Sequence, residues 1–159
     1  MKITHYTVPG AKLNLGTTSK FKTLRIQVTF HAPLNEATVT GRAILPYLMR
    51  SINETYPTRS AMQTKLEDMY AASFGGSVRK IGLAQEISFD LHIIDPQYAL
   101  ESTDLLTEAF EFLHDVLFKP KFELSIFKDE VRLMDEYFLG LYSNKMRYTM
   151  KELIALMYE

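Results

Sequence analysis

Apolar and polar residues alternate along three early segments of the chain, and this spacing predicts half-buried β-strands. The clearest segment is residues 23–33, in which every even-numbered position from Leu24 to Phe30 is apolar. Residues 3–8 and 12–17 are shorter runs, separated by a Pro-Gly pair that is typical of a turn. We therefore expect three strands before the first helix.

Helical spacing follows the strands. A first helix is predicted over residues 41–52, with Thr38 or Thr40 as its N-cap, because a threonine hydroxyl can accept a hydrogen bond from a first-turn amide. Pro46 lies inside this helix and lacks an amide hydrogen, so we expect a kink there. A second helix is predicted to begin after Ser60 and to end at the Gly-Gly pair that precedes the next strand.

A β-hairpin and three further helices complete the pattern. The hairpin is predicted from residues 77–83 and 86–94, and its second strand alternates apolar and polar positions. The helices are predicted over residues 100–117, 122–142 and 147–158. This order of elements is typical of an α+β fold, with a mainly antiparallel sheet and helices packed on one side.

Composition and charge narrow the class of function. Eighteen basic and 19 acidic residues give a net charge of −1, which does not favour a nucleic-acid or anionic-membrane partner. The absence of cysteine excludes disulfides and a cysteine nucleophile. No run approaches the ~20 apolar residues of a membrane span, and the first residues lack a signal-peptide pattern. We expect a cytoplasmic protein with a single domain over residues 1–159. The apolar final helix favours an N-terminal fragment of a longer chain.

The segment Thr-Val-Thr-Gly-Arg-Ala-Ile-Leu-Pro-Tyr-Leu-Met, residues 38–49, carries the main chemical signal. It resembles the zinc helix of the insulinase/pitrilysin-type peptidases (the inverzincins), where Gly-x-Ala precedes His-x-x-Glu-His. In that frame Ile44 and Leu48 stand at the two zinc-binding histidines, and Tyr47 stands at the catalytic base. Aliphatic side chains have no lone pair for a metal, and a phenol with a pKa near ~10 is a poor base at neutral pH. The resemblance therefore implies a zinc-peptidase homologue that is not an enzyme.

Three later segments resemble the same family. Residues 67–76 resemble its second helix and the turn into its substrate-pairing strand, and residues 113–122 resemble its aromatic-Pro-x-Phe junction. Residues 127–136 resemble the helix of the third zinc ligand, a Glu seven residues after another acid. The resemblance thus puts Glu136 at the ligand position and Asp129 at its acidic partner. Because a catalytic zinc needs three protein ligands, these are vestigial metal-site positions.

The segments 45–47, 56–57 and 144–148 resemble, more narrowly, catalytically inactive bacterial subunits of the YfmF type, which occur beside an active YfmH-type homologue. In this family two similar halves close into a shell, and substrate is added as a β-strand. The resemblance implies an insulinase- or mitochondrial-processing-peptidase-like domain with no cofactor of its own, zinc being expected only in an active partner. Its expected partners are that active homologue or a second homologous half, and an extended peptide.

The substrate-pairing edge strand of the family corresponds to Ser77, Val78, Arg79, Lys80 and Ile81. Adjacent cations protect an edge strand from aggregation while they leave its backbone free. The predicted function is therefore a non-catalytic contribution of peptide binding or enclosure to a two-subunit or two-half processing peptidase.

Two alternatives remain open. One is an active zinc metallopeptidase. Its ligands would have to lie outside this chain, because none of the four histidines forms a helix-borne metal pair. The other is a stand-alone protein-interaction module. Glu111, His114 and Asp115 share a predicted helix surface and could bind a cation, but a solvated polar face is the favoured interpretation.

Overall fold

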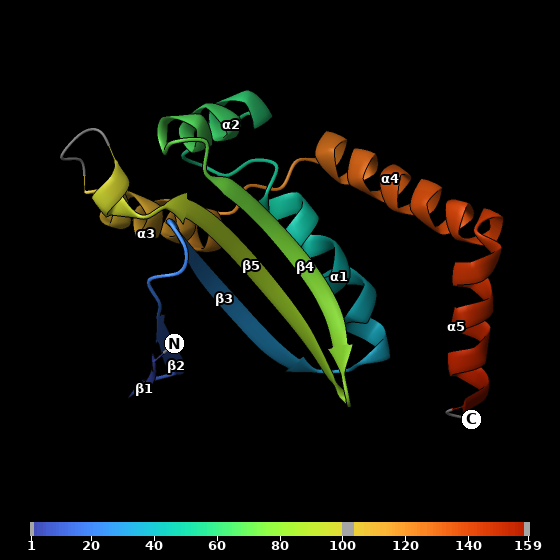
Figure 1. Cartoon of the computed structure of the whole chain (residues 1–159). Helices are drawn as coiled ribbons and strands as arrows, with labels where there is room; N and C mark the ends of the chain where they lie inside the picture. Colours follow the sequence, from blue (N-terminus) through green and yellow to red (C-terminus); the bar gives the residue numbers. More distant parts are fainter. Residues whose placement is uncertain (1, 100–103, 158–159) are drawn as a thin grey trace.

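The computed structural model describes residues 2–99 and 104–157, and it confirms the α+β fold (Figure 1). Two antiparallel sheets are formed by the described residues. The central sheet has the strand order β3-β5-β4, and a separate hairpin pairs β1 with β2. The strands are β1 Lys2–Val8, β2 Ala11–Thr17, β3 Thr23–Pro33, β4 Ser73–Ile81 and β5 Ala84–Ile94.

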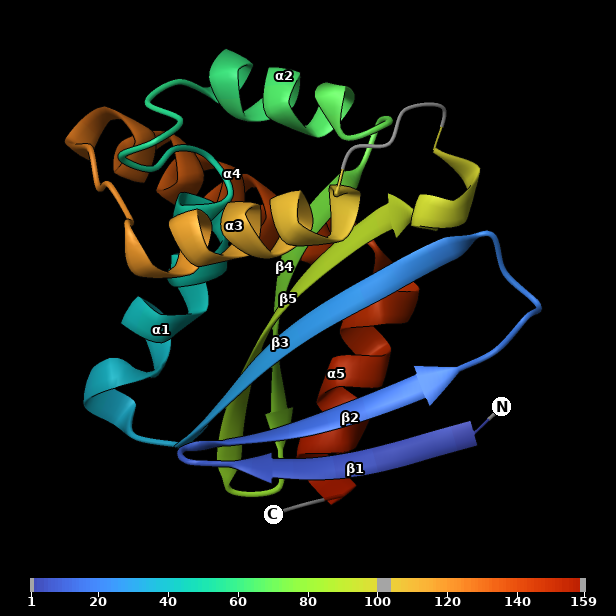
Figure 2. The ribbon, with the colours of Figure 1, turned by 90° about the vertical axis from the view of Figure 1, so that its left-hand side faces the viewer.

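Helices cover one face of the central sheet. Helix α1 contacts β4 and β5, and α3 contacts β5; Figures 1 and 2 show both helices on the same side of the strands. Helix α2 lies beside α3 (Figure 1). Helix α4 contacts α1 and α5, and α5 lies beyond the β4 side of the sheet (Figure 1). The helices are α1 Glu36–Met49, α2 Arg59–Asp68, α3 Leu105–Phe118, α4 Leu124–Ser143 and α5 Lys145–Met157, with a 3₁₀ turn η1 at Pro96–Tyr98.

The core lies between β5 and the helices. The odd-numbered residues of β5 point to this side, and Phe89, Leu91 and Ile93 are buried. Phe112 of α3 and Met69 after α2 are fully buried in the same layer. Each such side chain stabilises the fold by about 1.5–3 kcal/mol through removal of apolar surface from water. The alternation that predicted this strand therefore reflects one helix-covered face.

The predicted N-caps of the first two helices are wrong by a few residues. The N-cap of α1 is Asn35, whose Oδ1 accepts a hydrogen bond from the amide of Ala37 at 2.9 Å. The N-cap of α2 is Thr58, whose Oγ1 accepts from the amide of Ala61 at 3.0 Å. Both caps satisfy first-turn amides, so the principle holds while the position differs.

The Gly-Gly pair does not end α2, as the sequence pattern predicted. The chain turns instead through Tyr70 and Ala71, whose φ angles are +59° and +55°, and the two glycines lie inside β4. A Cβ at Gly76 would lie 2.6 Å from the Cβ of Pro46, whereas one at Gly75 would meet nothing within 4 Å. Gly76 therefore permits close packing of α1 against β4, one of the roles of a glycine inside a strand.

The remaining predicted elements agree with the structure within a few residues. The first part of the predicted helix at 100–117 and the last residue of the one at 147–158 lie outside the described residues. Helix α1 continues through Pro46, which is buried. In the described part of the chain, no helix has the length and apolar character needed to cross a membrane.

Candidate functional site

The segment that resembles a peptidase zinc helix forms most of α1, and it has aliphatic side chains at the two positions that the resemblance assigns to zinc-binding histidines. Ile44 and Leu48 are 8% and 6% exposed, on a helix that packs on β4 and β5. Tyr47 is half-buried, and the guanidinium of Arg50 lies 5.1 Å from the centre of its ring. A metal ion needs lone-pair donors, and the aliphatic pair supplies none. The residues present in α1 therefore do not fit a zinc ion.

The two acids assigned to the vestigial site lie at the surface of α4. Glu136 accepts a hydrogen bond from Nη1 of Arg132 at 2.6 Å, and its side chain is 58% exposed. Asp129 is exposed as well. The structure brings neither carboxylate into a buried site with α1. Within α4, all of whose residues are described, only Glu130 is buried.

Glu130 joins three segments that are distant in the sequence. Its Oε1 accepts hydrogen bonds from Oγ of Ser51 at 3.2 Å and from Nη2 of Arg59 at 3.1 Å. Ser51 follows the end of α1, and its Oγ also lies 3.0 Å from the carbonyl oxygen of Tyr47. The hydroxyl has one proton and can donate to one of these acceptors at a time. The C-terminal end of α1, the first residue of α2 and the middle of α4 are thus held at one buried carboxylate.

The positive charge beside this carboxylate comes from a guanidinium. A buried carboxylate is stable only when it is paired and hydrogen-bonded, because water no longer solvates it. Arg59 provides the pairing, because its Nη2 lies 3.1 Å from Oε1 of Glu130. The Arg59 side chain is half exposed, whereas that of Glu130 is only 6% exposed. No local pattern predicts this cluster, because Arg59 and Ser51 lie 71 and 79 residues before Glu130 in the sequence.

The predicted peptide-pairing residues lie at the edge of the central sheet. Among the described residues, β4 pairs with β5 alone, so one side of its backbone is not used by another strand. Arg79 is not a free cation, because its Nε donates to the buried carboxylate of Glu86. Lys80 is exposed, and no carboxylate pairs with it in the described part of the chain. The edge is therefore available, with Lys80 as its free charge.

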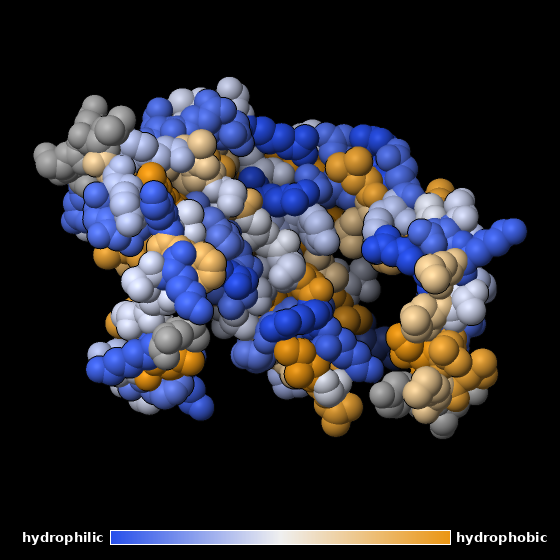
Figure 3. Space-filling view, in the orientation of Figure 1, coloured by the Kyte–Doolittle hydropathy of each residue, from blue (hydrophilic) through white to orange (hydrophobic). Residues whose placement is uncertain are grey.

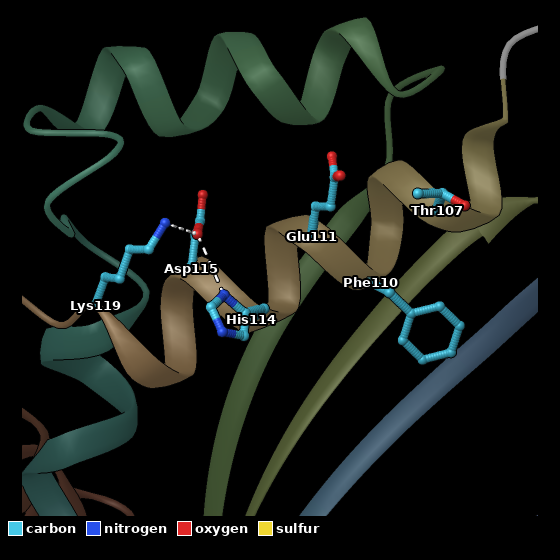
Figure 4. A pocket seen from close by; sticks show the side chains of 6 residues that line it. All are labelled: Thr107, Phe110, Glu111, His114, Asp115 and Lys119. Carbon is cyan, nitrogen blue, oxygen red and sulfur yellow. Dashed lines mark hydrogen bonds and ion pairs between the residues drawn. The ribbon is translucent and has the colours of Figure 1, made fainter.

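A broad pocket of about 520 Å³ lies along α3 (Figure 4). It contains the three residues considered for a cation, Glu111, His114 and Asp115. Asp115 Oδ1 is 2.7 Å from Nζ of Lys119 and 3.5 Å from Nδ1 of His114. Glu111 extends from the same side of α3 as Asp115, and Figure 4 draws no contact between it and these three residues. No group of three potential metal ligands occurs among the described residues.

The pKa of Asp115 reflects this ion pair. The hydrogen bond from Lys119 lowers the pKa of the Asp115 carboxyl, partial burial opposes this effect, and hydrogen bonds from Thr55 and His114 add to the lowering. The same contact raises the pKa of Lys119. Both shifts result from the pairing, which favours the charged forms of the mostly buried Asp115 carboxylate and the half-exposed Lys119 ammonium.

Comparisons with known proteins agree with the peptidase-like segment. No profile of a known protein family matches the chain. It is 29% identical over 150 residues to the "Probable inactive metalloprotease YmfF" of Bacillus subtilis (strain 168). The match covers 91% of this chain and 35% of that protein. The relative is therefore named YmfF, where the sequence pattern predicted the YfmF type.

A solved structure has a similar fold. The chain resembles a crystal structure of "a conserved protein from Enterococcus faecalis V583" with a TM-score of 0.80 and 31% identity, over 86% of this chain and 33% of that one. The chain thus spans about a third of the length of each relative. The similarity to the Bacillus subtilis protein supports a relationship to YmfF-like proteins, and that relative is named as a probable inactive metalloprotease.

Proposed function

We propose that this chain is a non-catalytic homologue of insulinase-type peptidases that binds or encloses peptide within a two-subunit or two-half processing peptidase. The main support is the free edge of β4 in a fold whose α1 has no metal donors at the histidine positions. Strand addition requires backbone amides and carbonyls and no catalytic side chain. A chain that has lost hydrolysis can therefore retain substrate binding.

The free edge indicates the character of the bound peptide. Residues Ser77–Ile81 supply backbone donors and acceptors, and the neighbouring side chains supply the selectivity. Because Arg79 is held by Glu86, the free cation on this edge is Lys80. An extended peptide with an acidic residue near Lys80 is the proposed ligand, bound more tightly when a partner half covers it.

Glu130 also bears on the vestigial metal site. In the family pattern an acid precedes the third zinc ligand by seven residues, and we assign Glu130 to that acid because it is the buried carboxylate of α4. The ligand position then falls on Tyr137, one residue after Glu136. In this register the three ligand positions hold Ile44, Leu48 and Tyr137, which are poor zinc donors. The buried carboxylate of Glu130 is then balanced by Arg59 and not by a metal.

Amide hydrogen exchange tests the peptide edge. In an edge strand, alternate amides face away from the neighbouring strand and exchange quickly, whereas both sets are protected in a central strand. We expect fast exchange at alternate positions of Ser77–Ile81, and slowing at those positions when an acidic extended peptide is added. A peptide with the acids replaced by amides is the control. Strong protection of all five residues before peptide is added, unchanged afterwards, would exclude this edge as the binding site.

A second experiment tests the register of α4. Ile44→His, Tyr47→Glu and Leu48→His together restore the family motif on α1. If Glu136 were the third ligand, adding Glu136→Ala to this triple variant would weaken zinc binding, measured by competition with a chelating dye. In the proposed register, adding Glu136→Ala to the triple variant has no effect on its zinc affinity. Adding Tyr137→Glu to the triple variant is instead expected to make it bind zinc more tightly.

A further inference from the structure

A cavity between α4 and α5 is separate from both α1 and the β4 edge. Its volume is about 330 Å³, at the lower end of the roughly 300–1,000 Å³ range of small-ligand pockets. This size suits one or two residues of a peptide rather than a protein surface. The cavity is lined by Phe138, Leu141 and Tyr142 of α4 and by Arg147, Tyr148 and Lys151 of α5.

The walls of the cavity are aromatic and accessible. The rings of Tyr142 and Tyr148 lie 5.5 Å apart between centroids, and Phe138 is 50% exposed. Figure 3 shows apolar side chains gathered over α5, to the right of the sheet. A ligand side chain that enters this space removes aromatic surface from water, so apolar or aromatic groups are favoured.

The same cavity carries two cations. The guanidinium of Arg147 lies 5.8 Å from the ring centre of Tyr137, and Nζ of Lys151 lies 5.9 Å from that of Tyr148. In the described part of the chain Arg147 has no carboxylate partner, and Lys151 has only Glu152, at 3.7 Å, with both side chains well exposed. Arg147 therefore offers positive charge that no described carboxylate neutralises, and Lys151 adds a cation whose ion pair is long and exposed.

The two helix ends at this cavity do not add positive charge. Asn144 Oδ1 accepts a hydrogen bond from the amide of Arg147 at 3.1 Å and caps the start of α5. The C-terminal end of α4, at Ser143, lies directly before it and carries the opposite partial charge. The attraction for an anion therefore rests on the side chains of Arg147 and Lys151 beside an aromatic wall.

We propose that this cavity binds the C-terminal residue of a peptide. The free carboxylate binds Arg147 and Lys151, and the apolar side chain of the same residue packs against Phe138, Tyr142 and Tyr148. A terminal Phe or Leu carries a carboxylate and an apolar group on one residue, as this combination of cations and rings requires. An internal Asp or Glu has the carboxylate without the apolar group, and it leaves the rings uncovered.

A pair of peptides tests the site on the unaltered protein. Fluorescein-labelled peptides that end in Phe, one with a free carboxylate and one with a terminal amide, are compared by fluorescence anisotropy. We expect the free acid to bind at least about tenfold more tightly, because a charge-assisted hydrogen bond contributes at least a factor of about ten. Equal binding of acid and amide would overturn the proposal. So would equally tight binding of an amidated peptide with an internal Glu, since the site would then recognise side-chain carboxylates.

Variants of α5 locate the binding. Arg147→Gln is expected to weaken binding of the free acid about tenfold and to leave the amide unchanged. Lys145→Gln is the matched control, because Lys145 is an exposed cation of α5 outside the cavity lining. If both variants weaken binding equally, the attraction is a general charge effect and the site is not there. Exchange at Ser77–Ile81, measured in the same samples, reports on the β4 edge separately.

Discussion

Replacing Arg59 by Met is expected to destabilise the fold, because it leaves the buried carboxylate of Glu130 without its cation. The two side chains approach to 3.1 Å between Nη2 and Oε1, and they are 53% and 6% exposed. Met keeps much of the aliphatic length of Arg and removes the charge. The effect on stability therefore comes mainly from the ion pair rather than from lost packing.

The expected magnitude follows from the distance and the exposure. Two unit charges about 3 Å apart attract by about 5 kcal/mol at an effective dielectric constant of 20 and by about 1 kcal/mol in water. Breaking a fully buried pair costs about 3–5 kcal/mol. Since half of the Arg59 side chain is in solvent and Ser51 still donates to the carboxylate, we expect a loss of about 2 kcal/mol.

Urea denaturation followed by circular dichroism measures this loss. The matched control is Arg132→Met, which breaks the Arg132–Glu136 pair at 2.6 Å with side chains 61% and 58% exposed. Although that pair is the shorter one, its solvation predicts a loss below about 0.5 kcal/mol. If Arg59→Met costs no more than Arg132→Met, the carboxylate of Glu130 is not desolvated and the reasoning fails.

A double-mutant cycle isolates the pair itself. Glu130→Gln keeps the shape of the side chain and an oxygen for the Ser51 hydroxyl, and it removes the charge that needs Arg59. In the Glu130→Gln background, Arg59→Met is expected to be nearly neutral, so the coupling energy equals most of the single-variant loss. Equal losses in both backgrounds would assign the effect to packing of the Arg59 stem.

Three further variants test the packing and the pH dependence. Gly76→Ala is expected to cost about 1–3 kcal/mol because the new methyl group meets Pro46, whereas Gly75→Ala has open space and is expected to stay within about 0.5 kcal/mol in the same denaturation assay. The pKa of Asp115 is lowered in the fold by Lys119, so its contribution is complete above the unfolded pKa of about 3.9 and is lost as the pH falls through the folded value. Asp115→Asn should therefore destabilise the protein at pH 7 and show a shrinking difference below about pH 4; a constant difference would contradict the assignment.

Local patterns in the sequence predicted the elements well. The alternation of residues 23–33 and 86–94 identified two strands because one face of the sheet is covered by helices and the other is polar. The Gly-Gly pair was misassigned because two explanations exist for such glycines, a turn and a close approach. Only the packing of α1, through Pro46, decides between them.

The candidate site was predicted less completely. The motif predicted that Ile44, Tyr47 and Leu48 share one helix, and the structure confirms this because the motif lies within α1; their assignment to metal-site positions stays a prediction. The acid on α4 could not be chosen in the same way, since Asp129, Glu130 and Glu136 are all charged and helix periodicity alone does not say which one faces the interior. The contacts to Ser51 and Arg59 depend on tertiary packing across more than 70 residues.

The zinc content of the purified protein tests the central claim most directly. After incubation with excess zinc and dialysis against buffer, elemental analysis is expected to give far less than one zinc per chain, because Ile44 and Leu48 of α1 have no metal-binding atoms and Glu130 is paired with Arg59. One zinc per chain, retained through dialysis and lost in Glu130→Gln, would contradict the proposal that the metal site has been replaced.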